Sequence, residues 1–320
     1  MEDPMATRPL EGKIAVVAGA TRGAGRGIAC ELGEAGATVY CTGRSVRGRP
    51  ASGKNRPETI EETAEMVTEH GGVGIHVQVD HTVPGQVEAL FERIKSEQSG
   101  VDILINDVWG GDALTEWGKT FWSHSLDKGL LMIERAVHSH IITSHFGVPL
   151  MLDRPSGLIV EITDGNFFGY RGNFFYDFVK TSVIRLAFSM ARELRKTNVS
   201  AVAVTPGFLR SEEMLEHFDV TEANWQDGAK KDANFIMSET PFFVGRAVAA
   251  LAADPNVSEK TGRVFSSWDL SDEYGFADVD GRRPHWGRHF EKTYGRRIKN
   301  CDDPFYEYWF DNPMEAVLGD

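Results

Sequence analysis

The feature that most constrains this chain is an apolar run that leads directly into a glycine-rich turn and then into a helical pattern. Residues 13–18 (KIAVVA) are apolar and β-branched, and the run is long enough for one buried strand. Gly19, Gly23 and Gly25 follow, ahead of a helical pattern that carries Ile28. Backbone N–H groups at a helix N-terminus bind anionic phosphate, and glycine lets a pyrophosphate approach closely. This order of elements therefore predicts a dinucleotide-binding loop.

The end of the next strand indicates which dinucleotide to expect. Residues 38–42 (TVYCT) form this strand, and Gly43-Arg44-Ser45 follows it. In a dinucleotide fold this point lies beside the adenosine ribose, where an acidic residue binds a free 2′-hydroxyl and an arginine accepts a 2′-phosphate. Arg44 stands here, and Arg22 in the glycine loop adds a second cation. We therefore expect NADP(H) rather than NAD(H), with a solvated surface arginine as the alternative for Arg44.

Strand and helix patterns alternate through the rest of the chain. Further strands are predicted within residues 73–79, 101–107, 157–163, 199–210 and 262–267, and helices at about 59–70, 83–98, 130–152 and 242–253. Repeats of this length predict an α/β, single-domain Rossmann fold, whose core is a doubly wound parallel sheet of about seven strands. In such a fold, ligands bind at the carboxyl ends of the strands. Residues 1–270 would form the catalytic domain, and residues 271–320 an irregular, aromatic C-terminal tail.

Charge and cysteine content argue against several other classes of protein. The net charge of −13 argues against a nucleic-acid partner, which would need a basic face. Cys30, Cys41 and Cys301 are odd in number and share no CxxC spacing, which favours a reduced protein. We see neither a signal peptide nor the ~20 apolar residues of a membrane span, and expect a cytoplasmic protein. His138 and His145 could share a helix face, but no carboxylate or cysteine completes a metal set, so no metal is expected.

Tyr176 and Lys180 stand four residues apart in FFYDFVK (residues 174–180), at the start of an apolar helical pattern. On a helix this spacing places the phenol and the ammonium on one face. A phenol with a pKa near ~10 is a poor base at neutral pH, and a neighbouring cation lowers that pKa. The pair therefore predicts proton-transfer chemistry, although a solvated helix face is the alternative for the pair considered alone.

Together these motifs resemble the short-chain dehydrogenase/reductase family over roughly residues 10–270. Besides the glycine loop, the matching features are Asp80 as the adenine-contacting acid, Asn106 as the first Asn of an Asn-Asn-Ala-Gly stretch, the Tyr-x3-Lys pair, and Pro206-Gly207 near the nicotinamide. The cofactor-binding residues that we expect are Gly19, Thr21, Arg22, Gly23, Gly25, Arg44, Ser45, Asp80, His81, Asn106, Tyr176, Lys180, Pro206 and Gly207. The segment YGFADVDGRRP (274–284) resembles the branch represented by dehydrogenase/reductase member one.

The sequence also departs from the family pattern at three places. Asp107 follows Asn106 where the family has a second Asn, and Ala136 stands where it usually has the Asn of a proton relay. The family's substrate-binding Ser corresponds to Thr163 when counted back from the Tyr, but to Asp164 when the strand is aligned. A Thr hydroxyl could replace Ser, whereas an ionised Asp only accepts hydrogen bonds and opposes formation of a phenolate. We expect Thr163 to fill this role.

The resemblance implies hydride transfer between nicotinamide and a carbonyl or alcohol carbon, with Tyr176 as general acid or base, Lys180 assisting and Thr163 binding the substrate oxygen. Aromatic residues near the pair predict a bulky apolar small-molecule substrate, or else core packing: Trp109, Trp117, Trp122, Phe167, Phe168, Phe174 and Phe175. The alternatives are a dinucleotide-binding sensor or structural protein with little catalysis, and an epimerase or dehydratase on the same fold. The resemblance also implies a homodimer or homotetramer. The aromatic tail, which includes Phe305 and Trp309, would pack on its own domain, on a second subunit or over the pocket.

Overall fold

The computed structural model describes residues 8–49, 56–166 and 170–295. Within these residues, seven parallel strands form one sheet in the order β3-β2-β1-β4-β5-β6-β7. The strands are β1 (Ile14–Ala18), β2 (Thr38–Gly43), β3 (Val73–Gln78), β4 (Ile103–Asn106), β5 (Gly157–Ile162), β6 (Val199–Thr205) and β7 (Val264–Ser266). The order reverses between the neighbours β1 and β4, which makes their carboxyl ends a switch point where α/β folds bind ligands. The doubly wound sheet predicted from the sequence is confirmed.

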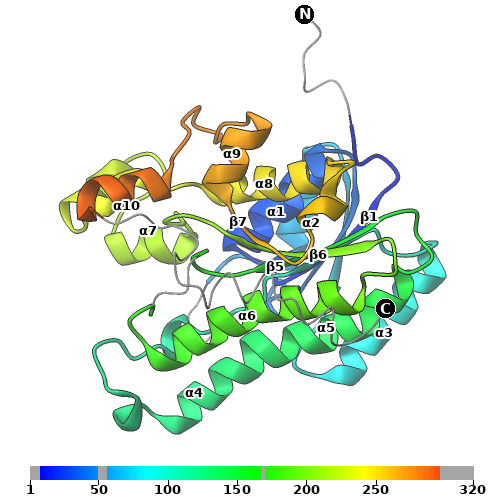
Figure 1. The fold of residues 1–320 in the computed structure, drawn as a ribbon, viewed down its shortest axis with the longest axis horizontal. Helices are drawn as coiled ribbons and strands as arrows, with labels where there is room; N and C mark the ends of the chain where they lie inside the picture. The colour runs from blue at the N-terminus through cyan, green and yellow to red at the C-terminus, as the bar shows by residue number, and fades with distance from the viewer. Residues whose placement is uncertain (1–7, 50–55, 167–169, 296–320) are drawn as a thin grey trace, which may run out of the picture.

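Helices cover both faces of this sheet (Figure 1). They are α1 (Gly23–Glu34), α2 (Ile60–Glu69), α3 (Pro84–Glu97), α4 (Leu126–Ile133), α5 (Ser139–Gly147), α6 (Phe174–Glu193), α7 (Glu212–Phe218), α8 (Pro241–Ala253), α9 (Ser267–Tyr274) and α10 (Trp286–Tyr294). One face carries α1, α2 and α8, and the other carries α3, α5 and α6. No helix in the described ranges is long and apolar enough to cross a bilayer.

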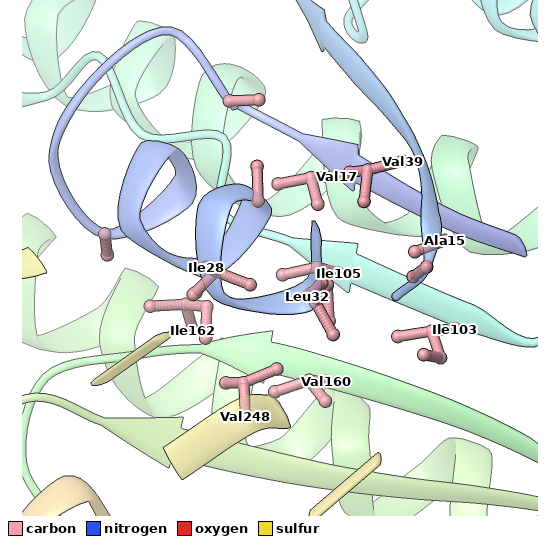
Figure 2. Packing of buried hydrophobic residues seen from close by; sticks show 14 of the residues in the cluster. Ala15, Val17, Ile28, Leu32, Val39, Ile103, Ile105, Val160, Ile162 and Val248 are labelled. Atoms are coloured by element: carbon pink, nitrogen blue, oxygen red, sulfur yellow. The ribbon is translucent and has the colours of Figure 1, made fainter. Parts of the chain in front are cut away.

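The apolar core is divided by the sheet into two layers. Along β1, Ala15 and Val17 pack toward α1 and α8, as Figure 2 shows for their neighbours Ile28 and Val248. Val16 belongs to the layer on the opposite face, with side chains of α3. Successive side chains of a strand point to opposite faces, so a strand covered on both sides must be apolar throughout. This is why the apolar runs in the sequence located the strands well.

The long helix predicted at residues 130–152 is interrupted in the structure. α4 ends at Ile133, Glu134–His138 form a π-helical turn, and α5 begins at Ser139. The Ser139 hydroxyl donates to the Arg135 carbonyl at 2.5 Å, which satisfies a backbone acceptor within the wider turn. Ala136 lies inside this turn and is 2% exposed, so the wider turn falls at the position where the sequence lacks the expected Asn.

Part of the segment expected to be irregular is helical. α9 ends at Tyr274 and is capped by Gly275 (φ 81°). α10 follows the cap residue His285, whose ring accepts a hydrogen bond from the Arg288 amide at 3.1 Å. A stable helix near His285 was not expected, because Gly, Pro and Arg are frequent around it. The described part of the extension packs on this same chain: the Asp278 carboxylate accepts from the Thr240 amide at 2.8 Å. Cys301 and the tail aromatics near Phe305 lie outside the described residues.

Candidate active site

A cleft of about 910 Å³ opens at the carboxyl ends of the central strands. Its lining includes most of the residues that the sequence singled out: Gly19, Thr21, Arg22, Gly23, Arg44, Ser45, Asp80, His81, Thr163, Tyr176, Lys180, Pro206 and Gly207. Gly25 and Asn106 were also expected at the cofactor but are absent from this lining. Both lie just behind the cleft wall, where they support the residues that form it.

The glycine loop packs too closely for side chains at two of its positions. Gly19 has φ 97°, and a Cβ there would lie 2.5 Å from the Asp107 carbonyl oxygen. A Cβ on Gly25 would lie 2.4 Å from the Gly19 carbonyl oxygen, so Gly25 allows α1 to pack against the loop. The Gly23 amide donates to Glu212 Oε2 of α7 at 2.8 Å. An anionic group is thus held at the N-terminus of α1, where the helix dipole and the amides favour negative charge.

Arginines surround the far end of the cleft, and each has an acidic neighbour. Arg44 lies 3.7 Å from Asp80, and Arg22 lies 3.5 Å from Glu58. Arg56, whose side chain is 8% exposed, pairs with Glu213 of α7. Sequence reasoning missed Arg56 because it follows a long Gly- and Pro-rich segment with no periodic pattern. The cleft therefore combines amide donors, cations and sufficient volume, and these residues fit a dinucleotide.

His81 is fixed between a strand and a helix. Its Nε2 lies 2.8 Å from the Thr42 hydroxyl, and its Nδ1 lies 2.8 Å from the Thr143 hydroxyl. Burial lowers the pKa of His81 to about 3, with a smaller lowering from His140. His81 is therefore neutral, and the positive charge at this end of the cleft comes from the arginines.

Tyr176 and Lys180 occupy the first two turns of α6, as their spacing predicted. The helix begins where the Asn173 side chain accepts a hydrogen bond from the Tyr176 amide at 3.1 Å, and this cap sets where the phenol lies. The phenol donates to Asp164 Oδ2 at 2.8 Å. The Thr163 hydroxyl instead donates to the Lys180 carbonyl at 2.8 Å, which ties β5 to α6. Asp164 therefore contacts the phenol, whereas the expected role of Thr163 at the substrate oxygen stays a prediction.

The electrostatics around the phenol reverse one expectation from the sequence. The pKa of Tyr176 is raised well above its ordinary value, first by burial and then by the Asp164 carboxylate, which also accepts its hydrogen bond. The sequence predicted a lowered pKa because of Lys180. Burial lowers the pKa of Lys180 itself, while Asp164 and Asp107 act in the opposite direction. The Lys180 ammonium lies 4.2 Å from the ring centroid of Trp109, a cation–π contact.

A buried polar network lies beneath the loop that follows β4. Asn106 donates through Nδ2 to Glu161 Oε1 at 2.7 Å and to the Ser144 hydroxyl at 2.9 Å. His140 Nδ1 lies 2.6 Å from Glu161 Oε2, and His140 Nε2 lies 3.1 Å from the Val108 carbonyl oxygen. Sequence reasoning had assigned no functional role to His140. The one available signal was Glu161, a carboxylate within an otherwise apolar strand, which needs a buried partner.

The remaining walls of the cleft are largely apolar. Trp109, Phe208, Met214, Trp268 and Trp286 line it, and the last of these comes from the C-terminal extension. Of these, the sequence singled out only Trp109.

The other aromatic candidates lie elsewhere or outside the described residues. Trp117 packs on the Tyr176 ring at 5.3 Å, whereas Trp122 is 75% exposed and contacts Phe121. Phe174 also packs on Phe121, and Phe175 contacts His124. Phe167 and Phe168 fall outside the described residues. Among the residues that the structure does describe, no three His, Cys, Asp or Glu side chains are grouped so as to hold a metal ion.

Several known proteins have sequences similar to that of this chain. A family model for short chain dehydrogenases matches residues 13–222. Dehydrogenase/reductase SDR family member 1 of Homo sapiens is 36% identical over 279 residues, covering 86% of this chain and 85% of that protein. The 3-oxoacyl-[acyl-carrier-protein] reductase FabG of Aquifex aeolicus is 30% identical over 205 residues, covering 63% of this chain and 76% of that protein.

Solved structures show the same fold. A short chain dehydrogenase from Mycobacterium thermoresistibile superposes with a TM-score of 0.71 at 21% identity, covering 87% of this chain and 92% of that one. The L-sorbose reductase of Gluconobacter frateurii, solved with NADPH and L-sorbose, gives a TM-score of 0.66 at 20% identity, covering 85% of this chain and 97% of that one.

The match to the family model spans the glycine loop, the Tyr176–Lys180 pair and Pro206-Gly207. Family membership implies a nicotinamide dinucleotide as cofactor and hydride transfer as the chemistry. The chain accordingly belongs to the short-chain dehydrogenase/reductase family of oxidoreductases, in the branch of SDR family member 1.

Proposed function

We propose that this protein is an NADP(H)-dependent oxidoreductase that interconverts a carbonyl and an alcohol on a bulky, apolar small molecule. The observation that carries the proposal is that one cleft combines the anion-binding amides of α1 with the Tyr176–Lys180 pair. A proton-transfer group beside a dinucleotide site is what carbonyl reduction needs from a protein.

Several residues of the chain would hold the dinucleotide. The Gly23 amide would bind pyrophosphate in place of the Glu212 carboxylate, and Arg44 with Arg22 would take the 2′-phosphate. Family resemblance places Lys180 at the nicotinamide ribose and Pro206-Gly207 beside the nicotinamide ring. When bound, the cofactor supplies or accepts the hydride. The NADPH held by the L-sorbose reductase of similar fold supports the choice of NADP(H).

Tyr176 would give a proton to the substrate oxygen in reduction and take one in oxidation. The raised pKa of Tyr176 keeps the phenol protonated at neutral pH, a state suited to reduction. Lys180 would hold positive charge near the forming alkoxide. Trp109, Trp268 and Trp286 would surround the rest of the substrate, which supports the bulky, apolar class.

Replacing the phenol tests this assignment directly. Tyr176→Phe keeps the ring packed against Trp109 and removes only the hydroxyl. NADPH oxidation with a panel of aromatic ketones and aldehydes should slow by at least ~100-fold, the scale of acid–base catalysis. Tyr170→Phe is the matched control, because Tyr170 is 65% exposed and outside the cleft lining. Turnover that survives in Tyr176→Phe would rule the mechanism out.

The cofactor preference needs a separate measurement. Binding of NADPH and of NADH should be compared by titration in the wild type and in Arg44→Ala. We expect the substitution to weaken NADPH by about tenfold and to leave NADH nearly unchanged, since only NADPH carries the 2′-phosphate. Equal losses for the two dinucleotides would argue against Arg44 as the phosphate ligand.

A dinucleotide-binding protein with little catalysis is the second candidate function. The observation in its favour is that the Tyr176 proton is already engaged by the Asp164 carboxylate. Tight NADPH binding with no turnover of any carbonyl in the panel would favour this candidate. Substrate conversion without net NADPH oxidation would instead indicate an epimerase or dehydratase. We also propose, from family resemblance and sequence, a cytoplasmic homodimer or homotetramer.

A further inference from the structure

We propose that the substrate is an α-hydroxy ketone, whose hydroxyl group donates a hydrogen bond to Asp164 while its carbonyl oxygen accepts the proton of Tyr176. The inference rests on the proposed function, because it assumes that Tyr176 protonates a carbonyl oxygen in this cleft. It narrows the bulky, apolar class of substrate by one polar group next to the carbonyl. It also assigns the selection of that group to Asp164.

The hydrogen bonds at the reacting end of the cleft lead to this class. The Tyr176 hydroxyl carries one hydrogen, which it donates to Asp164 Oδ2 at 2.8 Å. The Thr163 hydroxyl, in the same lining, donates its one hydrogen to the Lys180 carbonyl at 2.8 Å. A carbonyl oxygen only accepts hydrogen bonds, and so does a carboxylate. A simple ketone therefore meets two hydroxyl groups whose hydrogens are already engaged, and a carboxylate that offers it none.

A simple ketone can take the phenol hydrogen only if the bond between Tyr176 and Asp164 breaks. Among the described residues, Tyr176 is the one side chain that donates a hydrogen bond to the Asp164 carboxylate. Asp164 is partly buried, so the loss of that donor carries a free-energy cost. A hydroxyl group on the substrate removes this cost, because it donates to Asp164 while the phenol donates to the carbonyl oxygen. Each donor then has an acceptor.

The spacing of the two residues suits a hydroxyl on the carbon next to the carbonyl. The Tyr176 oxygen and Asp164 Oδ2 lie 2.8 Å apart. The two oxygens of an α-hydroxy ketone, when they lie on the same side of the molecule, are separated by about the same distance, ~2.7–2.8 Å, which is the length of one O–H···O hydrogen bond. The two substrate oxygens can therefore face the two protein oxygens side by side and form two parallel hydrogen bonds.

The Asp164 carboxylate is held in place through its backbone. Arg171, whose side chain is 4% exposed, donates through Nε to the Asp164 carbonyl at 2.5 Å. The same guanidinium binds Asp177 in the first turn of α6 at 2.9 Å. The next amide, that of Gly165, donates to the Thr205 hydroxyl at 2.7 Å. The turn after β5 is thereby tied both to α6 and to β6, so the position of the acceptor beside the phenol is built into the fold.

The surroundings of Asp164 favour a neutral donor over a charged one. The walls of the cleft are largely apolar, and an ammonium group would lose its hydration among them. Lys180 and Arg171 bring positive charge to Asp164 and would repel such a group. Asp112, another carboxylate of the lining, already accepts from the Trp109 indole at 2.7 Å. A hydroxyl group forms the hydrogen bond to Asp164 without desolvating a charge.

Reduction of such a ketone leaves the neighbouring hydroxyl unchanged. The carbonyl carbon gains hydride from the reduced dinucleotide, which is thereby oxidised, and the carbonyl oxygen gains the phenol proton of Tyr176. The product is a vicinal diol. The Tyr176 phenolate recovers its proton from water, and Asp164 accepts hydrogen bonds without giving or taking a proton. Oxidation of a vicinal diol follows the same steps in reverse.

The first test compares three aromatic ketones as substrates. The kcat/KM for reduction with NADPH is measured for α-hydroxyacetophenone, α-methoxyacetophenone and acetophenone. The methoxy compound keeps both oxygens and lacks the donor hydrogen. We expect the hydroxy compound to be preferred over each of the others by at least ~10-fold, because the analogues leave unpaired a polar group that binds a hydroxyl. Equal values for the three ketones would overturn the inference.

Substitution of Asp164 tests whether this residue makes the choice. Serine can donate a hydrogen bond to a carbonyl oxygen, so Asp164→Ser should lose the preference and gain relative activity on acetophenone. Asp112→Asn is the matched control, because it removes a carboxylate of the same lining that binds an indole rather than the phenol, and it should keep the preference. A preference that survives in Asp164→Ser, or that disappears in both variants, would show that Asp164 does not select the hydroxyl.

Binding without turnover provides a second readout. Dissociation constants of α-hydroxyacetophenone and α-methoxyacetophenone are measured by calorimetry with NADP⁺ present, in the wild type and in Tyr176→Phe. This variant lacks the group that competes with the substrate hydroxyl for Asp164 Oδ2. The preference for the hydroxy compound should therefore be larger in Tyr176→Phe than in the wild type. Equal affinities for the two compounds in Tyr176→Phe would contradict a hydrogen bond to Asp164.

The outcomes separate the substrate class from the proposed function. If Tyr176→Phe loses turnover but the wild type reduces the three ketones equally well, the proposed function stands and the α-hydroxy class is overturned. If Tyr176→Phe keeps its turnover, the proposed role of Tyr176 fails, and the binding comparison decides alone whether Asp164 selects the hydroxyl. A wild type that reduces none of the three ketones would overturn the α-hydroxy class as well. A preference that depends on Asp164 and survives in Asp112→Asn supports it.

Discussion

His140 stabilises the cleft without lining it. Its two ring nitrogens face a carboxylate oxygen of Glu161 and the Val108 carbonyl oxygen. The ring is thus held at both of its nitrogens within the buried polar network. Through Val108, the ring holds the segment that leads to Trp109 and hence the wall beside Lys180.

Removing His140 should destabilise the whole protein, because it leaves a buried carboxylate without its partner. We expect His140→Ala to lower the free energy of unfolding by about 3–5 kcal/mol, measured by urea denaturation at neutral pH. His138→Ala is the control: His138 lies on the same helical stretch but is exposed, and its removal should change little. Equal losses of unfolding free energy in the two variants would mean that the buried His140–Glu161 pair stabilises the fold no more than the exposed His138 does.

Individual residues show what the sequence could and could not predict. Tyr176 and Lys180 were found because their roles depend on spacing along one helix. Thr163 and Asp164 are successive residues at a strand end that both line the cleft, and Asp164 is the one that binds the phenol. Sequence spacing does not determine which of the two does so, because a shift of one residue exchanges their directions. His140 and Glu161 are 21 residues apart, and only folding shows that they are in contact.

At the scale of elements, α7 and the glycine loop are in direct contact. Glu212, at the start of α7, places its carboxylate on the Gly23 amide at 2.8 Å. Glu213, the next residue, pairs with Arg56, so α7 engages both the glycine loop and an arginine of the cleft lining. A dinucleotide must displace at least the Glu212 contact before its pyrophosphate can reach the N-terminus of α1.

Neutralising Glu212 should therefore strengthen cofactor binding. We expect Glu212→Gln to bind NADPH roughly two- to fivefold more tightly, since the competing anion at the helix N-terminus is lost. The dissociation constant can be followed by calorimetry at two salt concentrations. Glu88→Gln, on the exposed face of α3, controls for the change in net charge. Weaker binding in Glu212→Gln would show that Glu212 contributes to the site instead of competing for it.

The elements predicted from the sequence were accurate where burial determines the pattern. All seven strands of the described residues were located. The inner strands were found as apolar runs because the sheet is covered on both faces, and the edge strand β3 was found by its alternating pattern. The helix at residues 130–152 was predicted to be continuous, because a π-helical turn at residues 134–138 leaves the hydrophobic pattern almost unchanged. α10 was missed because Gly, Pro and Arg are frequent around its cap residue, His285.

At the scale of the whole molecule, the cleft is assembled from segments far apart in the chain. Trp286 of α10 and Trp268 of α9 line the same cleft as Gly19 of the glycine loop. No local pattern relates these segments, which is why the sequence left the position of the extension open. Their junction includes Glu239, which is 1% exposed. Its Oε2 accepts hydrogen bonds from the Gly207 amide at 2.9 Å and the Ser267 hydroxyl at 2.7 Å.

Glu239 makes stability depend on pH. Burial raises the pKa of Glu239 to about 8, against the lowering effect of its hydrogen bonds with Ser267 and Gly207. The folded protein thus keeps a proton that the unfolded chain releases near its ordinary pKa of ~4.3. Between these two values the unfolded state binds fewer protons, so stability falls as pH rises. The stabilising effect of the protonated form is complete below the lower value and is lost as pH rises through about 8.

Glu239→Gln should remove this slope, because the amide resembles the protonated carboxyl and does not titrate. Between about pH 5 and about pH 8, the free energy of unfolding of the wild type should fall relative to the variant by up to about 1.4 kcal/mol per pH unit. Urea denaturation of both proteins at several pH values measures the difference. Glu259→Gln, which removes an exposed carboxylate, controls for the change in net charge. A pH-independent difference for Glu239→Gln would mean that Glu239 is ionised in the folded protein. The junction between β6 and α9 would then hold a buried negative charge, which the nearby Arg210 would have to balance.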